Sequence, residues 1–215
     1  QGHHVEWADP PVSGKALADS YLTLYLGHLA ADLAWISDQT GVPVSRLAIE
    51  PTTRAIGRLG RSLPARDYEI AKRYWNTLAW DMAAFHRRFD VLVMPVAATP
   101  APRRGVLYPS RRREWLMTLL AMPGAAALAL KAGALERLAA EALRMTPFTQ
   151  LANLTGQPAM SVPMHVTPDG LPVGVQVLAP MGDERRLLAL AARLEAEVGW
   201  QAHLPRLIAP ASVCG

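Results

Sequence analysis

Cysteine and long apolar runs are scarce in this sequence of 215 residues. The single cysteine, Cys214, excludes a disulfide within the chain and permits a reducing compartment, so a cytoplasmic location is expected. The most apolar stretch, 116–130, is interrupted by Thr118, Pro123 and Gly124 and is shorter than the about 20 apolar residues that span a bilayer. The first residues show neither the basic nor the apolar segment of a signal peptide. We therefore expect no membrane anchor.

The short motifs of a self-contained hydrolase are also missing. The sequence has no Gly-x-Ser-x-Gly, no Ser-x-x-Lys and no His-Glu-x-x-His. Strand alternation would direct Ser161 into the packing of a sheet, so we do not expect it to be a nucleophile. Four residues near the N-terminus could hold a metal in principle: His3, His4, Glu6 and Asp9. Adjacent histidines cannot readily share one face of a strand, so we predict no metal site there. We also predict no cofactor and no catalytic residue in this chain.

The positive charge is diffuse and comes mostly from arginine. The net charge is +4, and basic residues gather only at 103–104 and 111–113. Such an excess is weak evidence for nucleic-acid binding, and solvated arginines in loops explain it equally well. We therefore expect no nucleic acid among the partners.

Two long helices are predicted in the first 90 residues. Ser13 is placed to cap a helix that runs to about residue 37, with apolar positions spaced at threes and fours: Leu17, Tyr21, Leu24, Ala31 and Trp35. His28 falls on that stripe, and we interpret it as a packed histidine with one nitrogen satisfied. The second helix is predicted over 64–89, with Ser62 as its cap. Its buried face is expected to comprise Ala71, Tyr74, Trp75, Leu78, Met82 and Phe85.

Strands are predicted before and after these helices. Residues 5–12 are expected to form a short strand that ends at a Pro-Pro turn. The apolar run 90–95 is typical of a strand buried on both faces, so we expect it to be central in a sheet. The Thr-Pro-Ala-Pro run at 99–102 ends regular pairing, and open α/β sheets place ligands at such strand ends. The segment 103–146 is longer than a usual connection and is predicted to form a variable helical lid or pocket wall.

The most informative part of the sequence begins at residue 147. The run Phe-Thr-Gln-Leu-Ala-Asn-Leu-Thr-Gly-Gln-Pro-Ala at 148–159 predicts a short helix that is stopped by Gly156 and followed by a strand. Pro-Asp-Gly at 168–170 predicts a tight turn into a second strand, so the two strands form a hairpin. Asp183 is placed to cap a closing helix that ends at Gly199. Residues 201–215 are expected to be a surface tail.

Three blocks of the sequence resemble the amidase signature family. Residues 90–102 are similar to that family's strand and Thr-Pro turn, and residues 148–163 to its Asn-x-Thr-Gly-x-Pro-Ala segment. Residues 170–195 are similar to its Gly-Leu-Pro-x-Gly-x-Gln strand and closing helix. The resemblance implies the α/β class, as the C-terminal part of an α/β/α fold with a mixed, partly parallel sheet flanked by helices. The whole range 1–215 would then be one part of a single amidase-like domain.

Members of this family cleave or transfer amide nitrogen with a serine, a cis-serine and a lysine. The nucleophile lies in a Gly/Ser-rich segment upstream of such a C-terminal part, and no Gly-Gly-Ser-Ser run exists in this sequence. The resemblance therefore implies an amidase whose catalytic residues lie on an upstream segment or partner chain, with a small-molecule amide as substrate. This chain alone is predicted to be inactive, and a homo-oligomer is compatible with the pattern.

Only pocket-lining roles could be carried over to this chain. The strand exit at Thr99 and the loop at Phe148 would face the upstream half, so both are predicted to bind substrate, although both could instead serve only in packing. The alternative function is a non-catalytic scaffold or amidotransferase-like subunit built on the same fold. The sequence of a co-purifying partner distinguishes the two hypotheses, because only an enzyme needs a Gly/Ser-rich loop and an upstream lysine.

Overall fold

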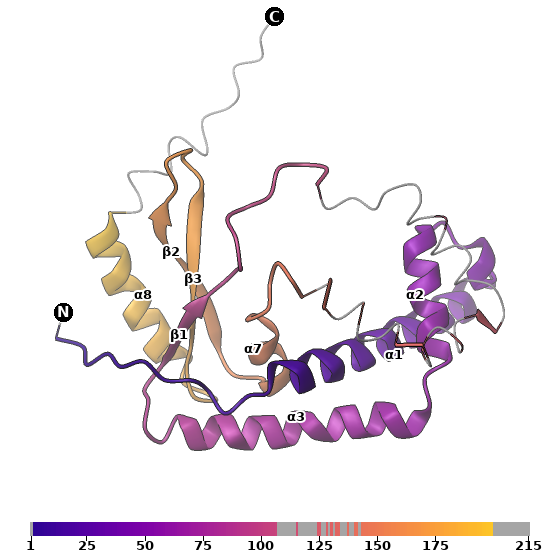
Figure 1. Ribbon diagram of the computed structural model, residues 1–215, viewed down its shortest axis with the longest axis horizontal. Helices are drawn as coiled ribbons and strands as arrows, with labels where there is room; N and C mark the ends of the chain where they lie inside the picture. The colour runs from indigo at the N-terminus through magenta and orange to yellow at the C-terminus, as the bar shows by residue number, and fades with distance from the viewer. Residues whose placement is uncertain are drawn as a thin grey trace, which may run out of the picture. The chain divides into compact units, whose positions relative to one another are not determined.

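The computed structural model describes residues 2–106 and 143–199, together with scattered positions between 115 and 141 (Figure 1). The chain divides into two compact units, one made of 1–79 and 102–145 and the other of 80–101 and 146–215. In its described part the first unit is helical, and the second contains the sheet, so each is treated by itself below. The prediction of a single domain over 1–215 stays a prediction.

The helical unit is built from α1 (Gly14–Thr40), the 3-10 turn η1 (Val44–Arg46), α2 (Pro51–Arg61) and the first part of α3 (Ala65–Phe85). The predicted start of α1 is confirmed, because the Ser13 hydroxyl accepts a hydrogen bond from the Ala16 N–H at 3.4 Å. The helix ends at Gly41, whose φ of 67° is the left-handed conformation that glycine adopts without strain.

The strand predicted over residues 5–12 is wrong. Residues 2–12 form neither helix nor strand, and the side chains of Val5 and Trp7 are exposed. A strand needs a hydrogen-bonded neighbour, and no described strand pairs with this segment. Pro10 and Pro11 also lack the N–H groups that a ladder requires.

Glycine backbone at the crossing of α1 and α2 brings the two helices into close contact. Leu26 of α1 and Leu59 of α2 are fully buried and pack together. A Cβ on Gly60 would lie 1.9 Å from the Leu26 carbonyl oxygen, which is far inside van der Waals contact. Because α2 covers the side of α1 that bears Leu26 and Leu33, the predicted stripe turns partly outward. Trp35 is 65% exposed, so its predicted burial is wrong.

Helix α3 ends at Phe85, four residues earlier than predicted. Ser62 is not its cap but the C-cap residue of α2, since its backbone N–H donates to the Leu59 carbonyl at 3.0 Å. The predicted apolar face is confirmed at three positions that are fully buried, namely Ala71, Leu78 and Met82. The Ser20 hydroxyl joins α1 to α3 by donating to the Ala71 carbonyl at 2.9 Å.

The second unit contains a three-stranded sheet with the order β1-β3-β2. The strands are β1 (Leu92–Pro95), β2 (Ala159–Val166) and β3 (Pro172–Leu178), and both pairings are antiparallel. The predicted hairpin of β2 and β3 is confirmed, with Gly170 at φ 83° in its turn. The described sheet lacks the parallel pairing that we predicted. β1 lies at an edge rather than in the centre, because among the described strands it hydrogen-bonds to β3 alone.

Two helices accompany this sheet, α7 (Gln150–Thr155) and α8 (Glu184–Val198). Both end at glycines with positive φ, Gly156 and Gly199, as predicted. Asp183 is the N-cap residue of α8, as predicted, but its side chain makes no cap hydrogen bond. The Asp183 carboxylate instead forms an ion pair with Arg186 Nε at 2.6 Å.

Some predictions fall where the structure gives no description. They concern most of the lid segment 103–146 and the tail at 201–215. Among the helices of the described ranges, none has the length and apolar character needed to cross a bilayer.

The close crossing of α1 and α2 predicts a strong effect of one added methyl group. Gly60→Ala should lower the free energy of unfolding by about 1–3 kcal/mol or more, because the Cβ would overlap the Leu26 carbonyl. Gly14→Ala is the matched control, since a Cβ there meets nothing within 4 Å. Urea denaturation followed by far-UV circular dichroism measures both. Equal midpoints for Gly60→Ala and the wild type would contradict the crossing.

Candidate functional site

The hairpin sheet presents two different faces. Alternation and register put Val93, Val177 and Met160 side by side on one face. α8 covers part of that face, with Leu187 packed among Val177 and Ala179. The opposite face carries Met94, Gln176 and Ser161 in one row across the three strands. The polar side chains of this row, Gln176 and Ser161, therefore lie on the face opposite to α8.

Gln176 lies in the middle of that row and is buried. Its amide Nε2 donates to the Met94 sulfur at 3.7 Å, a weak hydrogen bond. Ser161 is exposed, so the prediction that it points into the packing is wrong. The reason is that α8 packs against the other face, the one that bears Met160.

Gly174 leaves room for two neighbouring side chains at this row. A Cβ on Gly174 would lie 2.7 Å from the Ser161 hydroxyl oxygen and 3.2 Å from Val96 Cγ2. A larger residue at position 174 would displace the Ser161 hydroxyl and the Val96 side chain. Steric contact therefore explains the glycine of the Gly-x-Gln motif.

Hydrogen bonds of buried side chains hold the Thr-Gly-Gln-Pro turn between α7 and β2. The Thr155 hydroxyl lies 2.8 Å from the Leu151 carbonyl and 3.0 Å from Gln157 Oε1. Gln157 Nε2 donates to the Ala179 carbonyl at 3.1 Å, and the Ala179 N–H donates back to the Pro158 carbonyl. The motif residues thus join the end of α7 to the start of β2 and the end of β3.

The two predicted substrate-binding residues both lie in the sheet unit. Thr99 is exposed in the irregular segment after β1, and Phe148 is half-buried just before α7. Their shared role in lining a pocket stays a prediction.

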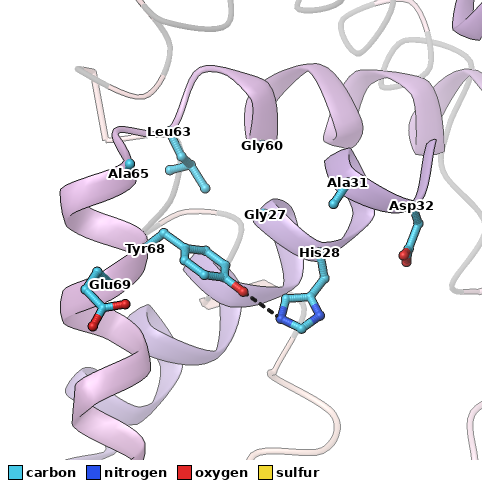
Figure 2. A pocket seen from close by; sticks show the side chains of 9 residues that line it. All are labelled: Gly27, His28, Ala31, Asp32, Gly60, Leu63, Ala65, Tyr68 and Glu69. Atoms are coloured by element: carbon cyan, nitrogen blue, oxygen red, sulfur yellow. Dashed lines mark hydrogen bonds between the residues drawn. The ribbon is translucent and has the colours of Figure 1, made fainter. Parts of the chain in front are cut away.

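An open hollow of about 740 Å³ lies instead in the helical unit, on α1, α3 and the end of α2. Figure 2 shows the Tyr68 hydroxyl directed at the His28 ring, with Tyr68 OH and His28 Nε2 2.9 Å apart. The predicted satisfaction of one His28 nitrogen is confirmed, although the side chain is exposed rather than packed. Neither a serine nor a lysine lines this hollow, so it lacks the groups of amide hydrolysis. The spacing of residues in the sequence could not reveal the contact of His28 with Tyr68, because His28 lies on α1 and Tyr68 on α3.

Three serines of the described residues have structural roles. Ser20 and Ser62 donate to backbone carbonyls, and Ser13 accepts a backbone N–H. None of these three is arranged as a nucleophile beside a base. No group of three metal-ligating side chains occurs within the described part of the chain, and His4 Nε2 lies 3.9 Å from the Glu6 carboxylate near the N-terminus.

Arg186 on α8 links this helix to the segment before β1. Its guanidinium donates to the Asp90 carboxylate and also pairs with Asp183. The hydrogen bond that Arg186 donates to Asp90 is the main cause that raises the pKa of Arg186, so this side chain stays charged at all ordinary pH values. The pairs are solvent-exposed and therefore position the helix end more than they stabilise it.

The family model described as Amidase matches residues 1–188, which include both units. The chain belongs to the amidase family. The resemblance to amidase signature enzymes is thereby confirmed, and it extends into the N-terminal helices, where the sequence showed only a helical pattern.

Relatives of this chain include 6-aminohexanoate-cyclic-dimer hydrolase from Pseudomonas sp. (strain NK87), which is 29% identical over 97% of this chain and 40% of the relative. Lipoamidase from Enterococcus faecalis is 28% identical over 91% of this chain and 26% of its own length. The chain thus spans well under half the length of these curated relatives.

Solved structures show the same proportion. The structure of 6-aminohexanoate cyclic dimer hydrolase matches with a TM-score of 0.71 and 25% identity, over 94% of this chain and 39% of that one. A bacterial aryl acylamidase of the amidase signature family matches in fold, with a TM-score of 0.62 at 18% identity. The two units therefore correspond to a portion of a larger amidase fold.

The buried turn at Thr155 predicts a measurable stability change. Thr155→Val removes the hydroxyl bonded to Leu151 and leaves Gln157 Oε1 buried without that donor, so unfolding should become easier by about 1–3 kcal/mol. Thr40→Val is the control, because its hydroxyl makes the same type of contact, to Ile36, in an exposed position. Thermal unfolding of both variants checks this, and a shift no larger than the control's would refute the role of the turn.

Proposed function

We propose that this chain is the C-terminal part of an amidase that hydrolyses the carbon–nitrogen bond of a small-molecule amide. The family match supports the reaction class. The observation that carries the two-part arrangement is that 97% of this chain matches only 40% of the Pseudomonas relative. The sequence also lacks the Gly/Ser-rich segment of an amidase nucleophile. The catalytic serine, cis-serine and lysine would thus lie on an upstream segment or partner chain.

In the proposed mechanism the upstream lysine, acting through the cis-serine, takes the proton of the nucleophilic serine. The serine oxygen attacks the amide carbonyl, and backbone N–H groups stabilise the oxyanion that forms. The amine leaves with a proton, and water then releases the acyl group from the serine. The described residues of this chain would supply scaffold and pocket wall, as part of an α/β/α fold whose complete sheet is mixed.

The substrate class is proposed from the names of the relatives. They include a hydrolase of a 6-aminohexanoate cyclic dimer, a lipoamidase and an aryl acylamidase. These names cover a cyclic amide and amides of other kinds, so a linear or cyclic carboxamide is the class that we propose.

Reconstitution tests the proposal. The chain alone should hydrolyse neither 6-aminohexanoate cyclic dimer nor an acyl anilide above background. Adding the polypeptide encoded directly before residue 1 should raise hydrolysis of at least one amide by about 100-fold or more, a modest fraction of ordinary enzymatic acceleration. Turnover by the chain alone would overturn the proposal, and a partner without a Gly/Ser-rich loop and lysine would favour a scaffold.

Thr99 and Phe148 are proposed to line the substrate pocket of the assembled enzyme. Phe148→Ala should raise KM by about tenfold, because apolar side chains provide much of the contact area in such pockets. Thr99→Val should change KM in the same assay if its hydroxyl contacts the substrate. Leu188→Ala, on an exposed position of α8, is the control. Kinetic constants equal to the control's for both variants would remove these residues from the pocket.

A further inference from the structure

The two edges of the three-stranded sheet differ in a way that indicates a partner. One edge is the outer side of β1 and the other is the outer side of β2. An exposed sheet edge is a template for another strand, and proteins protect true edges with proline, charges or bulges.

The β2 edge has such protection. The pairing of β2 with β3 shifts register between Pro163 and His165, which is a local bulge. Pro163 lacks an N–H group, and the exposed Ser161 and His165 are polar. This edge is built to stay at the surface.

The outer edge of β1 lacks such protection over the first three residues of the strand. Leu92, Val93 and Met94 are apolar, and Pro95 interrupts only the end of the strand. Val93 is 57% exposed although it lies on the face that α8 covers elsewhere. Such a strand is apolar enough to be central, yet in the described sheet it has one neighbour.

The hydrogen-bond phase shows which backbone groups this edge offers. The Val96 N–H donates to the Gly174 carbonyl at 3.5 Å, so these two residues form a hydrogen-bonded pair. In an antiparallel ladder hydrogen-bonded pairs recur at every second residue, so Met94 and Leu92 also hydrogen-bond to β3. The N–H and C=O of Val93 therefore point away from β3, toward the outer edge.

The same reasoning applies to the other edge. The Ala179 N–H donates to the Pro158 carbonyl at 3.1 Å, so Met160 and Val162 are the residues of β2 bonded to β3. The N–H of Ser161 then points outward, as that of Val93 does on β1. The two residues form a matched pair on opposite edges.

We propose that a strand of the upstream catalytic part of the amidase pairs with the outer edge of β1, with Val93 donating and accepting the central hydrogen bonds. This inference rests on the proposed function. The upstream part is the occupant because the chain matches only 40% of its Pseudomonas relative, and because the apolar run of β1 is that of a strand with two neighbours.

Amide hydrogen exchange of the full chain gives the test. The Val93 amide should exchange fast in the chain alone and at least about 100-fold more slowly after the polypeptide encoded directly before residue 1 is added. The Ser161 amide should exchange at the same rate in both states. Unchanged Val93 exchange in a mixture that has gained activity would overturn the inference and leave the proposed function intact. Protection of Val93 in the chain alone that rises with its concentration would identify a second copy instead and also overturn it.

Matched proline variants give a second readout. Val93→Pro removes the outward N–H without breaking a bond to β3, so the chain should keep its fold while its affinity for the upstream polypeptide falls about tenfold or more. Ser161→Pro makes the same change on the β2 edge and should leave that affinity unchanged. Equal affinities for the two variants, with circular dichroism showing both folded, would refute the choice of edge.

Discussion

The carboxamide of Gln157 holds together the segment that carries the family's most distinctive residues. It joins the Thr155 hydroxyl at the end of α7 to the Ala179 carbonyl at the end of β3, inside a buried turn. The Thr-Gly-Gln-Pro sequence is therefore explained by hydrogen bonding and chain reversal, and it needs no catalytic role.

Close backbone approach has the corresponding role in the helical unit. Gly60 lets α2 lie against the Leu26 carbonyl of α1, and the fully buried Leu26 and Leu59 fill the contact. Steric contact thus explains one glycine in each unit, Gly60 beside the Leu26 carbonyl and Gly174 beside the Ser161 and Val96 side chains. The described contacts of these residues are structural, and the sequence contains no Gly-Gly-Ser-Ser run.

Features with a local cause could be predicted from the sequence. Ser13 caps α1 and Gly156 and Gly199 end helices because each signal acts within one turn of chain. The errors concern partners distant in sequence. Trp35 is exposed because α2 covers another side of α1, and the run at 90–95 indicated a central strand although β3 is its only described neighbour. The site was predictable only as far as its family, since the proposed roles of Thr99 and Phe148 rest on the resemblance alone.

The proposed two-part amidase would form its acyl intermediate on the upstream part alone. Labelling the assembled protein with a serine-directed acylating probe, followed by mass mapping of the modified peptide, tests this directly. The label is predicted on a serine of the upstream polypeptide, with residues 1–215 unmodified. A label on Ser161 or any other serine of this chain would contradict the account.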